Sequence, residues 1–170
     1  MQKRCFVLAV LCLALGLFAK PPMQTKVTLQ HEAKQSVSIQ YLLYLPEDYD
    51  TKKDAKWPLL VFLHGAGERG DDIERVKVHG PPMLVEKGKH FPFIIVSPQC
   101  PRGQVWEADV LDALLDDLIR KHRVDTTRLY LTGLSMGGYG SWTWGFGQCD
   151  RFAAIAPICG GGNFIRAYNA

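Results

Sequence analysis

Four short runs of uninterrupted apolar residues constrain the fold of this chain more than any other feature of its sequence. They occupy residues 58–63, 93–96, 129–131 and 152–158, and a segment containing glycine or proline follows each of them. Continuous apolar runs are typical of parallel strands that helices cover on both faces, whereas half-exposed strands alternate apolar with polar residues. We therefore expect a mostly parallel sheet with helices on both faces, and we expect all four strands to be buried on both faces.

Two earlier segments have the alternating pattern instead. Residues 37–45 place Val37, Ile39, Tyr41, Leu43 and Leu45 on one face, which predicts a half-buried strand. Residues 26–30 alternate more weakly and predict a second strand. Early strands of this kind, followed by strand–helix–strand units, predict the α/β class.

A strong amphipathic helix is predicted between the second and third apolar runs. Its apolar stripe has helical spacing, and four aspartates are predicted to line the opposite, solvent-facing side. Basic residues at 120–123 crowd its C-terminal end, where positive charge suits the helix dipole, and we interpret His122 as part of that cap and not as a catalytic base. The stripe consists of Val110, Leu111, Leu114, Leu115, Leu118 and Ile119, and the aspartates are Asp109, Asp112, Asp116 and Asp117.

The N-terminus has the pattern of a secretory signal. A short basic segment precedes an apolar run that ends near Ala19, and this run is short for a membrane span. An uncleaved anchor and a buried helix are the alternatives. We predict a signal peptide at 1–19, a linker and first strand at 20–36 and an α/β domain at 37–170. The mature protein is then secreted or periplasmic, with no membrane association once the signal is cleaved.

Charge and cysteine content exclude several kinds of partner. The chain has 20 basic and 17 acidic residues, a net charge of +3, and no basic block that predicts nucleic-acid binding. After signal removal Cys100, Cys149 and Cys159 remain, so at most one disulfide forms, and we interpret each cysteine as a small buried hydrophobic residue. No cysteine or histidine spacing predicts a metal site, and no cofactor is implied.

The motif that indicates chemistry is G-x-S-x-G at residues 133–137. It follows an expected buried strand directly and precedes a segment of small residues, which is the strand-to-helix turn that a nucleophile elbow requires. Ser135 is the candidate nucleophile, and Gly133 and Gly137 are the flanking positions where a side chain would clash. The backbone N–H of Met136 is predicted to face the oxyanion.

A glycine-rich loop after the first apolar run supplies the second expected oxyanion donor. Residues 64–70 read His-Gly-Ala-Gly-Glu-Arg-Gly, and Ala66 is our candidate for the donating N–H. His64 is interpreted as a buried histidine with satisfied hydrogen bonds.

Four blocks of sequence resemble a known family. The blocks LHGAGERG, SPQCPRGQVW, RVDTTRLYLTGLSMGGYGSW and RFAAIAPICGGG occur in this order. Together they resemble the secreted α/β-hydrolases of the phospholipase/carboxylesterase and prolyl-oligopeptidase-like "predicted peptidase" group, and are similar to feruloyl and polyhydroxybutyrate-type esterases. The resemblance covers about residues 37–163. It implies the α/β-hydrolase fold, Ser135 as nucleophile, an oxyanion hole from Met136 and Ala66, and Trp106 and Arg69 near the cleft.

The chain departs from this family after the serine. The fold places its triad in the order serine, acid, histidine, yet Asp150 is the only acidic residue after Ser135 and all five histidines precede the serine. We therefore expect an N-terminal part of a hydrolase, truncated after the sixth strand, with negligible activity by itself. A base drawn from His64, His79 or His90 is the less favoured alternative.

Three functions follow from these residues. The first is a serine hydrolase of carboxylic esters that acts through an acyl-enzyme on a small-molecule or polymer ester. The second is a secreted serine peptidase of the prolyl-oligopeptidase type. The third is a non-catalytic binding protein on a hydrolase scaffold, which the missing histidine favours.

Overall fold

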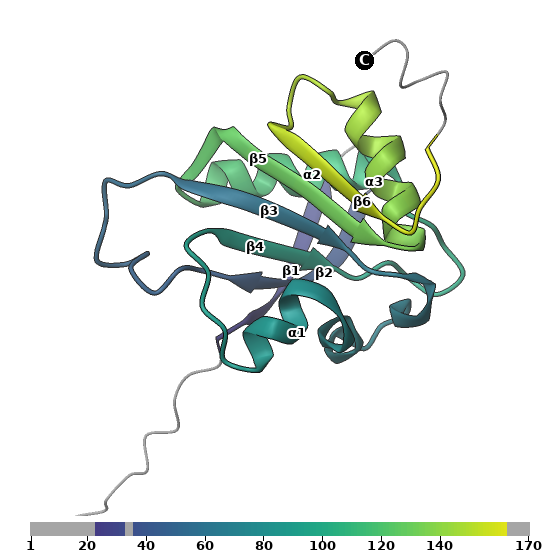
Figure 1. Ribbon diagram of the computed structural model, residues 1–170, viewed down its shortest axis with the longest axis horizontal. Helices are drawn as coiled ribbons and strands as arrows, with labels where there is room; N and C mark the ends of the chain where they lie inside the picture. The colour runs from purple at the N-terminus through teal and green to yellow at the C-terminus, as the bar shows by residue number, and fades with distance from the viewer. Residues whose placement is uncertain (1–22, 33–35, 163–170) are drawn as a thin grey trace, which may run out of the picture.

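The described residues form one six-stranded sheet. The computed structural model describes residues 23–32 and 36–162, so the predicted signal peptide at 1–19 lies outside the described residues. The strand order is β1-β2-β4-β3-β5-β6 (Figure 1). β3, β4, β5 and β6 are parallel to one another, whereas β2 is antiparallel to both β1 and β4. The strands are β1 (Thr25–Glu32), β2 (Ser36–Tyr44), β3 (Trp57–Leu63), β4 (Ile94–Pro98), β5 (Val124–Leu134) and β6 (Ala154–Ile158).

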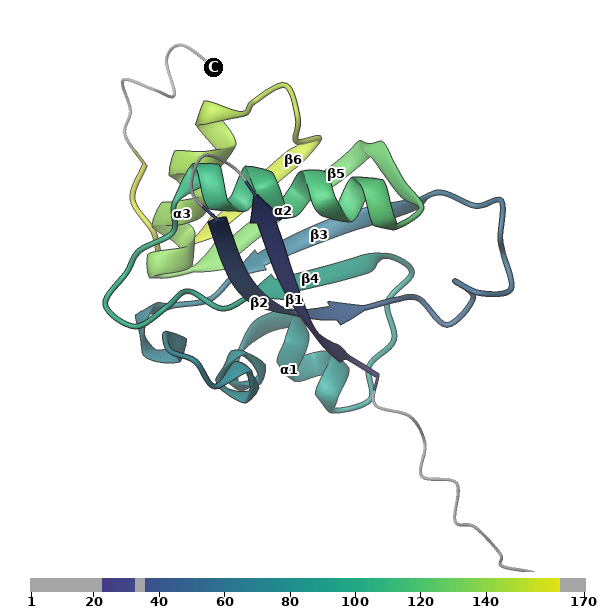
Figure 2. The same ribbon diagram turned by 180° about the vertical axis from the view of Figure 1, so that it is seen from behind.

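Helices lie on both faces of the sheet, as the apolar runs predict. α2 (Ala108–Lys121) and α3 (Met136–Gly147) cover one face, and α1 (Gly80–Glu86) lies on the other (Figures 1 and 2). Two 3-10 segments, η1 (Ala66–Glu68) and η2 (Ile73–Val78), follow β3 in the chain. The main core lies between the sheet and α2 and α3, and smaller clusters lie under η2 and α1.

β2 is more deeply buried than its alternating pattern predicts. Ile39, Tyr41 and Leu43 enter the main core, as expected. Leu42 and Tyr44 on the opposite face are also buried, at 2% exposure each, against η2 and α1. The prediction of a half-buried strand is therefore wrong, because the segments between β3 and β4 fold back over the second face of β2.

α2 has the expected apolar stripe, but two of its aspartates do not face solvent. Asp117 is 1% exposed and pairs with Arg120 and Lys121, the latter at 2.7 Å between Nζ and Oδ2. Asp112 accepts hydrogen bonds from Trp144 Nε1 at 2.9 Å and from the Arg151 guanidinium at 3.2 Å. The helix ends at Lys121 with His122 as its C-cap residue, as predicted.

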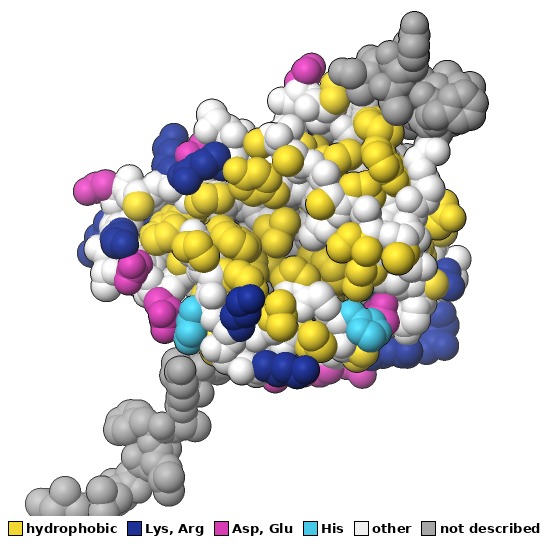
Figure 3. Space-filling model, viewed as in Figure 1, with side chains coloured by type: hydrophobic (Ala, Val, Ile, Leu, Met, Phe, Trp, Pro, Cys, Tyr) yellow, Lys and Arg dark blue, Asp and Glu magenta, His cyan; other side chains and the backbone are white. Residues whose placement is uncertain are grey.

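β5 and β6 depart from the prediction of burial on both faces. On one side of these strands Leu129, Leu131 and Ile155 pack into or against the main core. On the other side Tyr130 is 36% exposed and Ile158 is 46% exposed. The helices of the described residues leave this face of β5 and β6 uncovered, whereas Phe62 of β3 on the same face is buried against the start of α1. Figure 3 shows hydrophobic side chains gathered on this side of the sheet. The full burial expected for residues 152–158 is therefore wrong within the described part of the chain.

Candidate active site

Ser135 lies on a tight turn between a parallel strand and a helix. β5 ends at Leu134 and α3 begins at Met136, so Ser135 is the one residue between them. Ser135 has φ 51° and ψ −111°, a backbone conformation that non-glycine residues rarely adopt. Its side chain is exposed, and its hydroxyl does not cap α3. The turn therefore presents a free hydroxyl at the carboxyl end of the sheet, where α/β proteins place their sites.

The two motif glycines allow this turn to pack against its neighbours. A Cβ atom at Gly137 would overlap the carbonyl group of Leu63 at the end of β3, and would lie 2.8 Å from the His64 carbonyl oxygen. A Cβ atom at Gly133 would overlap the carbonyl group of Gly137 and lie 2.8 Å from the Leu63 carbonyl oxygen. A side chain at either position would clash, as predicted. The two glycines therefore allow α3 to pack directly against the ends of β3 and β5.

The glycine-rich loop lies beside the serine. A Cβ atom at Gly65 would be 3.8 Å from the Cβ of Ser135. Ala66 is the first residue of η1 and Met136 is the first residue of α3, so neither N–H has an acceptor within its own helix. Acyl transfer uses N–H donors of this kind beside the nucleophile to stabilise an oxyanion, so the N–H groups of Ala66 and Met136 remain the candidate donors.

His64 ties the glycine-rich loop to the loop that follows β4. Its side chain is 1% exposed, its Nδ1 is 2.6 Å from the Gly65 carbonyl oxygen, and its Nε2 accepts the Cys100 N–H at 3.0 Å. This assigns the proton to Nδ1. Burial lowers the pKa of His64, which favours the neutral ring that these bonds require. The prediction of a buried histidine with satisfied hydrogen bonds is confirmed.

Two arginines hold carbonyl groups of the same loop. Arg69 Nε donates to the Ala66 carbonyl oxygen at 3.1 Å, and its Nη1 donates to the Gln104 carbonyl oxygen at 3.0 Å. Arg75 Nη2 donates to the Gly67 carbonyl oxygen at 2.6 Å. These bonds fix the backbone around Ala66 before any substrate arrives.

A cavity of about 470 Å³ opens at Ser135. Trp106 forms one wall, as the family resemblance implies, and a Cβ atom at Gly140 would lie 2.8 Å from the Trp106 Cβ. Sequence reasoning missed Val105, Tyr139 and Thr143, which complete the lining. Tyr139 and Thr143 follow Ser135 at helical spacing along α3, so that spacing is a signal that could have found them. Val105 carries no such signal, since it lies in an irregular loop.

Among the described side chains, no cysteine or histidine forms a hydrogen bond with Ser135. Cys100 is buried, and burial raises the pKa of its thiol to about 11. Cys149 and Cys159 are exposed, so the interpretation of all three as buried hydrophobic residues is wrong for these two. His90 Nδ1 lies 3.1 Å from Glu47, and His79 Nε2 lies 3.8 Å from Glu68. Within residues 23–32 and 36–162, acidic, histidine and cysteine side chains form no cluster that could hold a metal ion.

Among the described residues, every helix is too short or too polar to span a bilayer.

Comparison with known proteins gives a consistent group of relatives. No family model matches the chain. It is 28% identical over 120 residues to the bifunctional acetylxylan esterase/xylanase XynS20E of Neocallimastix patriciarum, covering 66% of this chain and 17% of that protein. It is 30% identical over 125 residues to poly(3-hydroxyalkanoate) depolymerase C of Paucimonas lemoignei, covering 63% of this chain and 28% of that protein.

The solved structures that resemble this chain include esterases as well. The structure of a thermostable esterase is 32% identical, with a TM-score of 0.71, and the match covers 86% of this chain and 43% of the other. A ferulic acid esterase is similar in fold, with a TM-score of 0.61 at 24% identity, over 78% of this chain and 57% of the other. The chain spans less than a third of either curated relative and less than half of the thermostable esterase.

Proposed function

We propose that this chain, which has the α/β-hydrolase fold of the esterases it resembles, is the nucleophile-bearing part of a serine hydrolase that cleaves carboxylic esters. The observation that carries the proposal is Ser135 on its positive-φ turn, exposed to a cavity and beside the glycine-rich loop. Strained turns of this kind persist where function requires a fixed side-chain position. The neighbouring esterases support the reaction class.

The proposed chemistry has two steps. Ser135 Oγ attacks the ester carbonyl carbon while a general base takes its proton, and the N–H groups of Ala66 and Met136 donate to the resulting oxyanion. The intermediate collapses, the base returns the proton to the leaving alcohol, and an acyl group remains on Ser135. Water then attacks the acyl group by the same route and releases the acid.

The general base and its acid partner are proposed to come from residues outside these 170. The chain has no histidine after Ser135. His64 precedes it, but both of its ring nitrogens are engaged with backbone groups, so it has no lone pair to offer the serine hydroxyl. An acid and then a histidine after the last described strand would complete the order that this fold uses.

One observation favours a second candidate, a binding protein without catalysis. The missing histidine would leave Ser135 a weak nucleophile if no other polypeptide supplies a base. A peptidase of the prolyl-oligopeptidase type would use the same serine and oxyanion donors, and the described residues contain no feature that separates ester from amide.

The experiment compares ester with amide turnover by the native protein, which here means this chain together with the residues that supply the general base. We expect hydrolysis of 4-nitrophenyl acetate to exceed that of acetyl-4-nitroanilide and to disappear in the Ser135→Ala variant. Ser97→Ala is the matched control, because the buried Ser97 hydroxyl has no hydrogen-bond partner among the described residues. Turnover that survives Ser135→Ala, or preferential cleavage of the anilide, would overturn the assignment. No turnover of either substrate would favour the binding protein.

Export is proposed on the N-terminal sequence alone. A basic segment, a short apolar run and Ala19 have the form of a cleavable signal. N-terminal sequencing of the exported protein should begin near Lys20. A mature protein that still begins at Met1 would instead indicate an uncleaved anchor.

A further inference from the structure

The carboxylate of Glu68 lies beside Ser135, across a space that Gly65 leaves open. A Cβ atom at Gly65 would be 3.2 Å from Glu68 Oε2 and 3.8 Å from the Ser135 Cβ. Gly65 has φ −78° and ψ 179°, an extended conformation that any residue adopts, so its backbone does not require glycine. The missing side chain at Gly65 is instead what keeps the carboxylate within reach of a group bound at Ser135.

Glu68 is largely buried, yet no described residue donates a hydrogen bond to its carboxylate. Its side chain is 12% exposed. Two histidine nitrogens approach it, His79 Nε2 at 3.8 Å from Oε1 and His64 Nδ1 at 3.9 Å from Oε2. Both distances exceed that of a hydrogen bond, and His64 Nδ1 already donates to the Gly65 carbonyl oxygen. A carboxylate that is partly removed from water needs donors, so this one has unused capacity for a ligand.

The arginines of the same loop do not neutralise Glu68. Arg69 donates to two carbonyl oxygens, at 3.1 and 3.0 Å, and Arg75 donates to a third at 2.6 Å. In the described part of the chain the ion-pair contacts of Glu68 are limited to the two histidines. The loop therefore places an uncompensated negative charge beside Ser135, where it opposes a developing oxyanion unless the substrate brings a positive charge.

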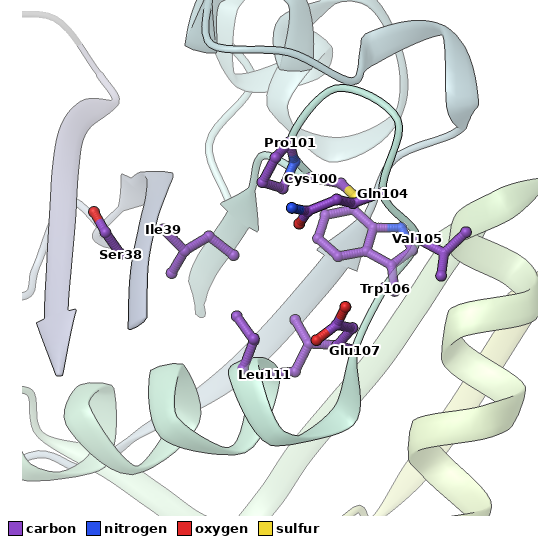
Figure 4. A pocket seen from close by; sticks show the side chains of 10 residues that line it. Ser38, Ile39, Cys100, Pro101, Gln104, Val105, Trp106, Glu107 and Leu111 are labelled. Carbon is purple, nitrogen blue, oxygen red and sulfur yellow. The ribbon is translucent and has the colours of Figure 1, made fainter. Parts of the chain in front are cut away.

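Glu107 is a second carboxylate near the cleft, but it belongs to a different hollow. It lines a cavity of about 250 Å³ together with Cys100 and Leu111, at the start of α2 (Figure 4). Glu107 is exposed and does not line the cavity at Ser135. It therefore offers a comparison for Glu68, since it carries the same charge in a neighbouring place.

We propose that Glu68 is a specificity-determining residue that binds the ammonium group of an amino-acid ester while Ser135 attacks the ester carbonyl carbon. The inference rests on the proposed function. In an α-amino ester the ammonium nitrogen is two bonds from the carbonyl carbon, so a carbonyl group held at Ser135 brings the ammonium to the space left by Gly65. The ammonium supplies three N–H donors to the carboxylate, and its charge offsets the repulsion between Glu68 and the oxyanion. The acyl transfer is the one proposed above, and its products are the free amino acid and the alcohol.

Two esters of the same shape test this preference. Alanine methyl ester and methyl isobutyrate differ in one group, an ammonium in the first and a methyl in the second. We measure kcat/KM of the native protein for both at pH 6.5, below the amino pKa of about 8, and compare their ratio between variants, because the greater intrinsic reactivity of the amino ester then cancels. Glu68→Gln should lower the ratio about tenfold, the usual loss for a hydrogen bond to a charged group. The value for methyl isobutyrate itself should not fall.

A second variant and a matched control locate the effect. Gly65→Ala fills the space between Glu68 and Ser135 and should also lower the ratio. Glu107→Gln removes the same charge from the neighbouring cavity and should leave the ratio unchanged. A ratio unchanged by Glu68→Gln would overturn the inference. An equal loss of both activities would also overturn it, and would indicate that Glu68 accepts a hydrogen bond from the residues that supply the general base.

Binding without catalysis separates this inference from the proposed function. The protein is the native protein carrying Ser135→Ala, and the probes are alaninamide and isobutyramide. We expect only alaninamide to shift the NMR amide signals of Gly65 and Glu68 in a saturable way, and Glu68→Gln to remove the shift. Ser135-dependent ester turnover with no alaninamide shift would overturn the role of Glu68 and leave the hydrolase intact. An alaninamide shift in a protein without Ser135-dependent turnover would overturn the hydrolase, and with it the role of Glu68 in ester specificity.

Discussion

His64→Ala is the substitution whose cost the structure defines most completely. It removes the acceptor of the Cys100 N–H at 3.0 Å and the donor to the Gly65 carbonyl oxygen at 2.6 Å. An unsatisfied buried polar group costs about 1–3 kcal/mol. The ring also packs on Trp106 with centroids 4.8 Å apart, and such aromatic pairs contribute about 0.5–1.5 kcal/mol. We expect the free energy of unfolding to fall by about 3–5 kcal/mol, a large share of the roughly 5–15 kcal/mol of a typical domain.

Urea unfolding of the native protein, followed by circular dichroism at pH 7.5, measures this loss. His64→Asn is the matched variant, because an asparagine amide can replace the Nδ1–H donor but does not reach the Cys100 N–H. It should lose about half as much free energy as His64→Ala. A loss below about 1 kcal/mol for the alanine variant would refute the reasoning, since the two bonds would then contribute nothing to the fold.

The remaining predictions concern the turn, pH and the isolated chain. Gly137→Ala should abolish soluble expression or raise the susceptibility of the site to proteolysis, because its Cβ would overlap the Leu63 carbonyl group; normal expression with an unchanged thermal midpoint would contradict this. The free energy of unfolding should decrease as the pH falls below 6.5, the ordinary pKa of histidine, because burial lowers the pKa of folded His64 and the unfolded chain then binds more protons. Urea titrations at pH 7.5 and 5.5 should show part of this decrease lost in His64→Asn. Residues 20–170 expressed alone should be poorly soluble, since Tyr130 and Ile158 lie on an uncovered apolar face of the sheet. They should also turn over no 4-nitrophenyl acetate above the Ser135→Ala background, and a soluble, active monomer would show that a base lies within these residues.

The elbow and the strands themselves could be predicted because their determinants are local. Gly133 and Gly137 are required by contacts within one turn and its two adjoining elements, and the motif carries that requirement in five consecutive residues. The continuous apolar runs likewise predict strands from neighbouring residues alone. This is why the fold class and the position of Ser135 follow from sequence.

Features that depend on distant partners could not be predicted in this way. Asp112 looks like a solvent-facing helix residue until Trp144 and Arg151, far along the chain, are placed against it. The exposed side of β6 follows from which elements cover the sheet, and an apolar run does not encode that. Val105 and Trp106 line the cavity at Ser135 in a loop that Arg69 and His64 hold by hydrogen bonds, and no pattern in the loop sequence indicates those bonds.

Labelling with a fluorophosphonate tests the central claim, that Ser135 is an activated nucleophile. The native protein is treated with the probe, digested and analysed by mass spectrometry, beside its Ser135→Ala variant. We predict one adduct, on Ser135 in the peptide that contains G-L-S-M-G, and no adduct in the variant. An unlabelled native protein, or an adduct on another residue that persists in Ser135→Ala, would contradict the account.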